Sequence, residues 1–289
     1  MNLGKAKTIL IIAFLGLNLF LGYHLYWPYL GQLTKTVVTA AELQQALAYL
    51  AANNYNLDAD IGRYVQKSTF LTVTPAQQGP EGIRDLFNQA TSSTSENGLT
   101  VYRDPDRVMT VHPGGQIQVE FQPGLFVVEQ SHTLEERELS RLVQQQLKEN
   151  FFLPEQLRFD YIEKVRTNDH RLILHFYRDI GGMPLFACYT KVFLEEDYIT
   201  ALEIYWLDPL EQPREGEMEV IPATDALIKL VDELGPGLLP RTITKVDLGY
   251  FSREYNAEMW EVPPVWRILM EDYSVYYINA FTGNLEADL

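Results

Sequence analysis

The stretch RLILHFYRDIGGMPLFACYTKVFLEE, residues 171–196, contains two strand-like runs on either side of a short turn. Both runs are rich in β-branched and aromatic residues, and Gly181 and Gly182 between them have the turn chemistry of a hairpin. Runs of the same kind precede and follow the pair, so we expect an antiparallel meander. Its strands are expected at 158–166, 171–179, 184–195 and 198–207.

A helix is expected just before this meander. Thr133 followed by Glu136 has the spacing of a capping box, which predicts the start of an amphipathic helix over 134–150. The same plan recurs later in the chain, where a helix at 221–234 is ended by the GPG of 235–237. Three strands follow this second helix, at 242–251, 263–271 and 274–280.

The chain before residue 131 is less regular. Apolar residues at helical spacing predict a helix over 36–52, with Thr39 as its N-cap. The other expected elements are strands at 63–74, 99–112 and 116–128, a short helix at 79–90, a polar loop at 91–98 and a turn at 112–115. Strands flanked by single helices are typical of the α+β class with antiparallel sheets. We predict a first α+β subdomain with a membrane-proximal helix at 30–130, and a C-terminal α+β region at 131–289 with helix-plus-meander units at 131–210 and 217–289.

An apolar segment near the N-terminus predicts a transmembrane anchor. Between Ile9 and Tyr26 only Asn18 and His24 are strongly polar, and the segment is long enough to cross most of a bilayer of about 30 Å. Bulky aromatic residues follow it, rather than the small residues of a cleavage site. We therefore expect an uncleaved anchor over residues 8–29.

The charges that flank this segment predict its orientation. Lys5 and Lys7 precede it, so the positive-inside rule places residues 1–7 in the cytoplasm and the rest of the chain outside. The expected location is the cell membrane, with a single-pass anchor and an extracellular ectodomain. Cys188 is the single cysteine, which excludes an intrachain disulfide and is typical of a bacterial envelope protein. It lies in a strand-like run, so we expect it to be a small buried hydrophobic residue rather than a nucleophile.

The composition excludes some classes of partner. The net charge is −16, and residues 36–289 carry −19, which disfavours nucleic acid and anionic lipid headgroups as partners. Hydrophobic residues make up 46% of the chain and aromatic residues 12%, which indicates packed cores rather than disorder.

Asn18 is the candidate functional residue of the anchor, because an amide inside an apolar helix costs free energy unless it finds a hydrogen-bond partner. Phe14, Asn18, Gly22 and Leu25 share one face by helical spacing, and Gly22 allows close approach of another backbone. We predict that this face binds another transmembrane helix. The alternative is that Asn18 lies shallow enough in the bilayer to be hydrated.

We find no motif for catalysis, a metal or a cofactor in the sequence. The zinc-protease, serine-hydrolase, P-loop and dinucleotide patterns are all absent. His170 and His175 are five residues apart on an expected strand, so they point to opposite faces and cannot share one metal. We predict a protein that is not an enzyme.

Residues 5–26, KAKTILIIAFLGLNLFLGYHLY, strongly resemble the start of the YycI proteins, and the predicted organisation of the whole chain is similar to that family. YycI proteins are auxiliary regulators of the WalK (YycG) sensor histidine kinase, which controls cell-wall metabolism in low-GC Gram-positive bacteria. The resemblance implies regulation without catalysis, through transmembrane contacts with a WalK-like kinase and a complex with a YycH-like partner. The sign of that regulation differs within the family.

Two alternatives remain open. The last segment, VYYINAFTGNLEADL (275–289), resembles the close of a PepSY-type unit, although Asn279 stands where that pattern has Asp. The chain would then be an envelope binding module tethered by its anchor. A cell-wall hydrolase whose acidic residues belong to no known pattern is a third, weaker reading.

Overall fold

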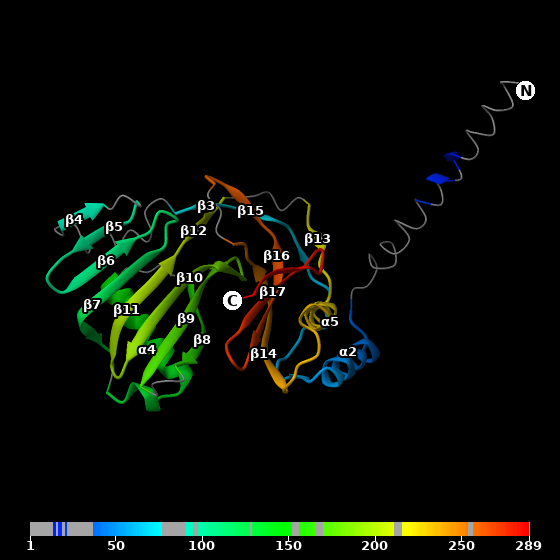
Figure 1. The fold of residues 1–289 in the computed structure, drawn as a ribbon, viewed down its shortest axis with the longest axis horizontal. Helices are drawn as coiled ribbons and strands as arrows, with labels where there is room; N and C mark the ends of the chain where they lie inside the picture. Colours follow the sequence, from blue (N-terminus) through cyan, green and yellow to red (C-terminus); the bar gives the residue numbers. More distant parts are fainter. Residues whose placement is uncertain are drawn as a thin grey trace, which may run out of the picture.

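The computed structural model describes residues 14, 15, 17, 18, 21, 37–76, 91–94, 98–127, 129–151, 156–165, 170–210, 216–253 and 257–288. Two sheet-and-helix halves lie side by side along the long axis of the molecule (Figure 1). The helices are α2 (Ala40–Ala52), η1 (Ser131–Thr133), α4 (Glu136–Phe151) and α5 (Ala223–Leu234). The strands are β1 (Tyr55–Leu57), β2 (Lys67–Ser68), β3 (Leu71–Pro75), β4 (Thr91–Thr94), β5 (Thr100–Arg103), β6 (Arg107–Val111), β7 (Ile117–Phe126), β8 (Leu157–Lys164), β9 (Arg171–Ile180), β10 (Met183–Glu195), β11 (Tyr198–Tyr205), β12 (Leu207–Pro209), β13 (Met218–Glu219), β14 (Arg241–Tyr250), β15 (Trp260–Val262), β16 (Pro264–Met270), β17 (Val275–Asn279) and β18 (Leu285–Asp288).

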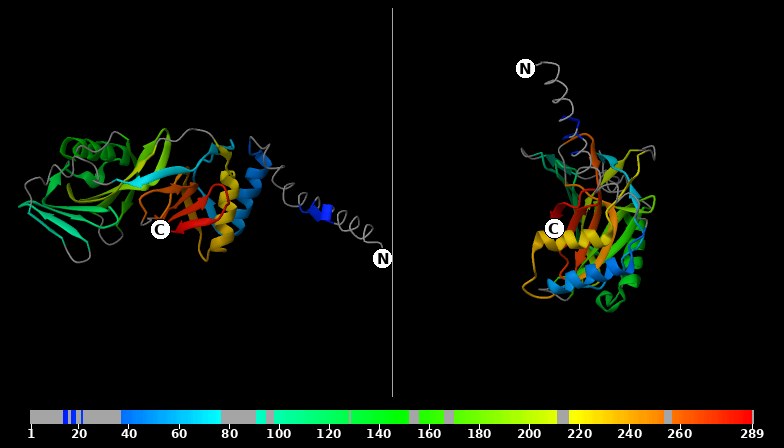
Figure 2. Two further views of the ribbon diagram at one scale, coloured as in Figure 1. Left: turned by 90° about the horizontal axis from the view of Figure 1, so that it is seen from above. Right: turned by 90° about the vertical axis from the view of Figure 1, so that its right-hand side faces the viewer.

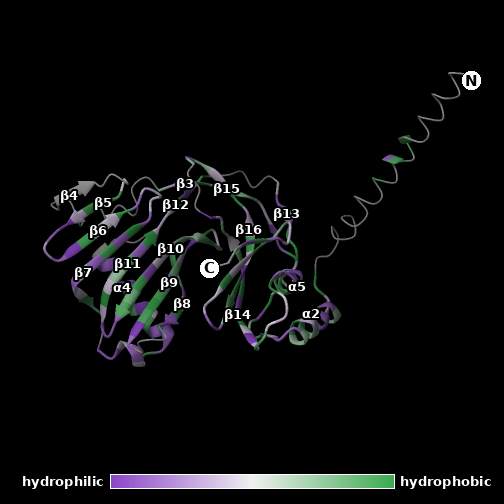
Figure 3. Ribbon diagram, viewed as in Figure 1, coloured by the Kyte–Doolittle hydropathy of each residue, from purple (hydrophilic) through white to green (hydrophobic). Residues whose placement is uncertain are grey.

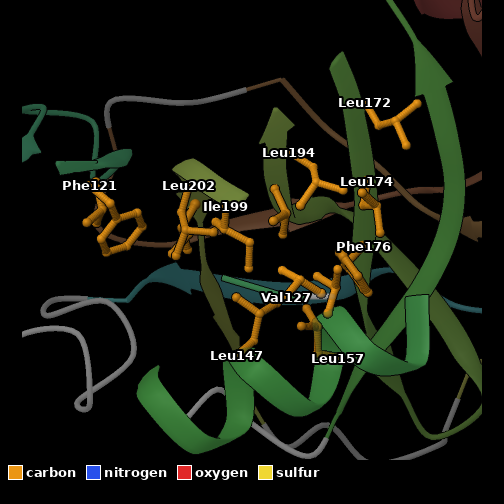
Figure 4. Close-up of a cluster of buried hydrophobic side chains, with 14 of the residues drawn as sticks. Phe121, Val127, Leu147, Leu157, Leu172, Leu174, Phe176, Leu194, Ile199 and Leu202 are labelled. Atoms are coloured by element: carbon orange, nitrogen blue, oxygen red, sulfur yellow. The ribbon is translucent and has the colours of Figure 1, made fainter. Parts of the chain in front are cut away.

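The first half, here called the α4 half, is an antiparallel sheet in the order β8-β9-β10-β11-β7-β6-β5-β4 with helix α4 on one face. Hydrophobic and hydrophilic residues follow one another along its strands (Figure 3). On β9, Leu174 and Phe176 are buried in the same core as Leu147 of α4 (Figure 4). Because side chains alternate along a strand, the residues between them lie on the face away from α4.

The second half, the α5 half, is the sheet β1-β14-β16-β17-β18 with helices α5 and α2. The two helices lie side by side at one end of the molecule (Figure 2). Leu227 and Leu230 of α5 are fully buried in one core with Ile268 of β16 and Ile278 of β17. Strand β1 pairs in parallel with β14, so a segment from before residue 60 completes a sheet made from the last 50 residues.

Strand β10 joins the two halves into one sheet. At Leu185 it pairs with β9 and with Tyr250 of β14, whereas from Tyr189 onward it pairs with β9 and β11. A bulge between Leu185 and Tyr189 lets the strand change neighbours. Gly249 lies at this junction, and a Cβ atom there would come within 2.5 Å of both the Phe186 ring and the Pro184 carbonyl oxygen.

The α+β class predicted from the sequence is confirmed, and so are several of the expected elements. Thr39 caps α2: its hydroxyl accepts a hydrogen bond from the Glu42 amide, and the Glu42 carboxylate accepts one from the Thr39 amide. Gly181 and Gly182 have positive φ in the β9–β10 turn, as the hairpin prediction requires. At the close of the chain, Asn279 accepts hydrogen bonds from the Phe281 and Thr282 amides, which holds the turn before β18.

Other expectations were wrong. Thr133 does not cap α4, because its hydroxyl donates to the Gln130 carbonyl and the helix begins at Glu136. The strand expected at 99–112 is two strands, since Asp104 caps the turn before Arg107. The strand expected at 63–74 is interrupted between β2 and β3, which pair with different strands, and residues 91–94 form β4 rather than a loop. The helix expected at 79–90 lies outside the described residues, and the division into subdomains stays a prediction.

Candidate functional site

A cleft of about 690 Å³ lies where the two halves meet, and we call it the central cleft. One wall is the face of β8, β9 and β10 that points away from α4. The other wall comes from β16, β17 and the turn between them, in the α5 half. Volumes of about 300–1,000 Å³ are typical of ligand pockets, and such pockets often lie between domains.

Three tyrosines form a row across the wall from the α4 half. Tyr177 of β9 pairs with Tyr189 of β10, which in turn pairs with Tyr205 of β11. Side chains at directly paired positions of neighbouring strands stand on the same face, within contact distance. The register of the sheet therefore presents a band of aromatic rings to the cleft.

A second row beside it is ionic. His175 pairs with Tyr161 on one side and with Lys191 on the other, and Lys191 pairs with Glu203. The Lys191 ammonium lies 3.4 Å from Glu203 Oε1, which also accepts a hydrogen bond of 3.0 Å from the Tyr189 hydroxyl. The charges of this row are thus satisfied by their neighbours on the sheet.

His175 is held from two sides. Its Nε2 lies 3.0 Å from Glu163 Oε2, and its ring stacks on that of Tyr161 with centroids 4.3 Å apart. The hydrogen bond from His175 lowers the pKa of Glu163 and outweighs the opposing effect of partial burial. Glu163 is therefore ionised at neutral pH and fixes the imidazole at the edge of the cleft.

A buried ion pair connects the two walls. The guanidinium of Arg267, on β16, donates to both carboxylate oxygens of Asp160, on β8, and the Nη2–Oδ1 distance is 2.9 Å. The two residues are only 3% and 8% exposed. The guanidinium also lies 4.1 Å from the centroid of the Phe186 ring. Bidentate geometry and a stacked aromatic face are the contacts that suit arginine over lysine.

Two residues of β14 complete this network. Arg267 Nη2 donates to Asp247 Oδ2 at 2.6 Å, and Lys245 Nζ lies 3.3 Å from Asp160 Oδ1. Burial alone would raise the pKa of Asp160, but Arg267 and Lys245 outweigh burial and lower that pKa. Asp160 is thus a carboxylate at neutral pH, despite its burial. Within the described residues, Arg267 Nε is buried without a hydrogen-bond partner.

The tyrosines around this network stay neutral. Burial first, and then the negative charge of Asp160, raises the pKa of Tyr161 and of Tyr277 well above the ordinary value for tyrosine. The pKa of Tyr177 is raised for the same reasons. Their hydroxyls can therefore donate and accept hydrogen bonds over the whole physiological pH range.

Cys188 lies behind the cleft wall and is not a nucleophile. It is fully buried, and its sulfur accepts a hydrogen bond of 3.0 Å from the Leu207 amide. Burial raises the pKa of the thiol to about 12, so almost none of it is thiolate at neutral pH. The expectation of a small buried hydrophobic residue is confirmed.

The residues predicted for the transmembrane face lie elsewhere in the chain. Phe14 and Asn18 are helical and exposed, whereas Gly22 and Leu25 lie outside the described residues. Among the helices of the described ranges, none is long and apolar enough to cross a bilayer. No described group of three or more His, Cys, Asp or Glu side chains could hold a metal ion. The predicted helix–helix contact of Asn18 stays a prediction.

Sequence reasoning did not find the central cleft. One signal was present in β16, where Arg267 interrupts the run PVWRILM, because a charge within a buried strand needs a partner. A second was β9, where Ile173, His175 and Tyr177 give an apolar and aromatic character to the face expected to be solvated. Neither signal identifies the residues that Arg267 or this face of β9 would contact, because those contacts depend on how the two halves dock.

A family model described as YycI protein matches residues 35–281 of this chain. The comparison with curated proteins found no match. Among solved structures, the chain is similar to the crystal structure of an uncharacterized protein from Eubacterium rectale ATCC 33656, with 13% identity and a TM-score of 0.47. That match covers 85% of this chain and 98% of the other. A likeness at this level carries no argument about function.

Proposed function

Because this chain belongs to the YycI family over residues 35–281, we propose that it is a membrane-anchored regulator that modulates a WalK-type sensor histidine kinase. The family places the chain in the regulation of the WalK two-component system, and it is a family of auxiliary proteins rather than of enzymes. The family match is the observation that carries the proposal. It spans the described structure from before α2 to the turn that precedes β18.

The proposed mechanism acts within the bilayer. Residues 1–7 lie in the cytoplasm, residues 8–29 cross the membrane, and the ectodomain lies outside. The face with Phe14, Asn18, Gly22 and Leu25 packs on a transmembrane helix of the kinase, and the Asn18 amide hydrogen-bonds across that contact. Such bonds are typically worth about 0.6–2 kcal/mol. A contact of this size shifts a two-state kinase only if it differs between the two states.

The ectodomain has two roles in this proposal. It sets the position of the anchor, because α2 begins only about ten residues after the proposed span. It also forms a complex with a YycH-like partner. The net charge of −16 supports a protein partner over nucleic acid or an anionic membrane surface. The central cleft belongs to this ectodomain, and none of its lining residues lies on α2 or α5.

The test is co-purification with the kinase from membranes. Full-length chain is compared with a variant in which residues 8–27 are scrambled at unchanged composition, so that both insert equally well. Recovery of the kinase with the native segment alone is the expected result. Equal recovery of the kinase with the native and the scrambled segment would show that the ectodomain makes the contact. Recovery with neither would contradict the proposal and favour a binding module tethered by its anchor.

A further inference from the structure

The central cleft has the properties of a ligand site, and this inference is independent of any contact with a kinase. Its volume of about 690 Å³ lies within the range of small-molecule pockets. It also lies at the junction of the two halves, which both supply walls. The chemistry of those walls limits what the cleft can bind.

Aromatic rings provide much of the wall. The row of Tyr177, Tyr189 and Tyr205 lies on one side, and the stacked rings of Phe251 and Tyr277, 3.7 Å apart, lie on the other. The faces of such rings carry partial negative charge and attract the weakly positive C–H groups on the face of a saturated ring. The cleft is therefore suited to a ligand with apolar ring faces.

Hydroxyl groups are the second feature. Within the described part of the chain, the hydroxyls of Tyr161, Tyr177 and Tyr277 have no hydrogen-bond partner. Tyr161 and Tyr177 are only half-buried, so their hydroxyls are accessible from the cleft. A neutral hydroxyl both donates and accepts, and its best match is a ligand whose own groups do the same.

The third feature is the charge balance. The protein carries −16 overall, yet three carboxylates and three cationic side chains line the cleft, with no net charge between them. Asp160 is paired with Arg267, and Glu163 with His175. Paired charges hold neither an anion nor a cation strongly, so the ligand is uncharged. The six charged side chains are Asp160, Glu163, Asp272, Lys191, Arg253 and Arg267.

The strand pairing in the wall from the α4 half disfavours an extended peptide as the ligand. Strand β9 lies between β8 and β10, and β10 lies between β9 and β11, so the strands that carry Tyr177 and Tyr189 have no free edge. Of the three strands in this wall only β8 is an edge strand of the described sheet, and its carbonyl group at Asp160 already accepts a hydrogen bond from Lys245. Peptides that bind to sheets usually add a strand at such an edge. Recognition in the central cleft is therefore made by side chains.

Apolar ring faces, many hydroxyls and no charge are together the properties of a neutral saccharide. We propose that the central cleft binds an uncharged saccharide, whose ring faces pack on the aromatic rows and whose hydroxyls bond to Tyr161 and Tyr177. The ion pairs around the cleft fix its shape. They form no salt bridge with the ligand, because the ligand is uncharged.

Isothermal titration calorimetry tests this proposal. The purified full-length chain is kept in a polyoxyethylene detergent, because detergents with sugar headgroups would compete. The probes are cellotriose and triacetylchitotriose, and the rival probe is N-acetyl-trialanine amide. The variants are Tyr161→Phe and Tyr177→Phe, which remove one hydroxyl each and keep the ring. Tyr64→Phe is the matched control, since Tyr64 is 75% exposed and lies outside the cleft.

The expected result is saturable binding of at least one saccharide and none of the peptide. Each cleft variant weakens that binding about three- to tenfold, as the loss of one neutral hydrogen bond predicts, while the control leaves it unchanged. Absence of binding by both saccharides overturns the proposal. So does binding of the peptide alone, or an affinity that neither cleft variant changes. If the variants and the unmodified chain have equal melting temperatures, a loss of affinity is not caused by unfolding.

Discussion

Asp160 and Arg267 are 107 residues apart in the chain, yet the guanidinium of Arg267 donates to both oxygens of the Asp160 carboxylate where the two halves meet. Asp160 lies at an irregularity in β8, between Phe159 and Tyr161, which frees it from the regular pairing with β9. The bond connects the α4 half to the α5 half, and both residues line the central cleft. The stability of the junction and the shape of the cleft therefore depend on the same pair.

Removing one member of this pair is expected to destabilise the protein strongly. Asp160→Asn leaves the buried Arg267 with Asp247 alone, and Arg267→Met leaves the buried Asp160 with Lys245 alone. Loss of one partner of a buried ion pair typically costs about 3–5 kcal/mol. Denaturant unfolding of the full-length chain, followed by tryptophan fluorescence, measures the free energy of unfolding.

The matched control is Asp208→Asn, which breaks an arginine–aspartate pair at the surface. Arg178 Nη1 lies 3.1 Å from Asp208 Oδ1, but the Asp208 side chain is 57% exposed. Water screens this pair, so the expected loss is under about 1 kcal/mol. Equal losses for Asp160→Asn and Asp208→Asn would show that the buried network does not hold the junction.

The stability of the junction is expected to fall in acid. The pKa of Asp160 is lower in the folded protein than its ordinary value of about 3.9, because Arg267 and Lys245 outweigh burial. The folded state therefore favours the carboxylate. The stability that Asp160 contributes is present above about pH 4 and is lost as the pH falls through the folded pKa.

The measurement is the free energy of unfolding between about pH 2 and pH 6. Asp160→Asn removes the titrating group, so its stability should depend less on pH in this window than that of the unmodified chain. If the free energy of unfolding changed with pH at the same slope in Asp160→Asn and in the unmodified chain, Asp160 would not be the group that titrates. Glu163, whose pKa is also lowered, contributes to the remaining slope in both proteins.

Gly249→Ala is expected to disrupt the junction by crowding. The added Cβ would lie 2.5 Å from the Phe186 ring and from the Pro184 carbonyl oxygen, and the carbonyl belongs to a paired strand that cannot move freely. Overpacking of this kind costs about 1–3 kcal/mol. Gly62→Ala is the control, because no atom lies within 4 Å of a Cβ at that position. A midpoint of denaturation that is the same for both variants would refute the prediction.

Asn18→Leu tests the proposed contact in the membrane. The substitution keeps the helix apolar and removes its one amide, so kinase output should change and recovery of the kinase from membranes should fall. A loss of about 0.6–2 kcal/mol corresponds to a roughly 3- to 30-fold weaker complex. Leu17→Ile is the control, because it keeps the segment apolar and alters no polar group. Unchanged kinase output and recovery for Asn18→Leu would remove the polar contact from the mechanism.

Elements defined by neighbours in the chain could be predicted. The hairpin of β9 and β10 follows from two β-rich runs around Gly181 and Gly182, and α5 follows from apolar residues at helical spacing before Gly235. The capping box at Thr133 failed for a reason that is also local. The Thr133 hydroxyl bonds back to the Gln130 carbonyl, in a turn of 3₁₀ helix that the spacing rule does not consider.

The sequence by itself determined the α+β class, the antiparallel hairpins, the helical periodicity of α2 and α5, and the burial of Cys188, because these depend on residues within a few positions of each other. The tertiary structure alone decided that β1 pairs with β14, that Tyr177, Tyr189 and Tyr205 form one row, and that Asp160 meets Arg267. Strand alternation states which residues share a face but not what that face packs against. The partner of a face is set by sheet register and by the docking of the two halves, and those depend on the whole chain at once.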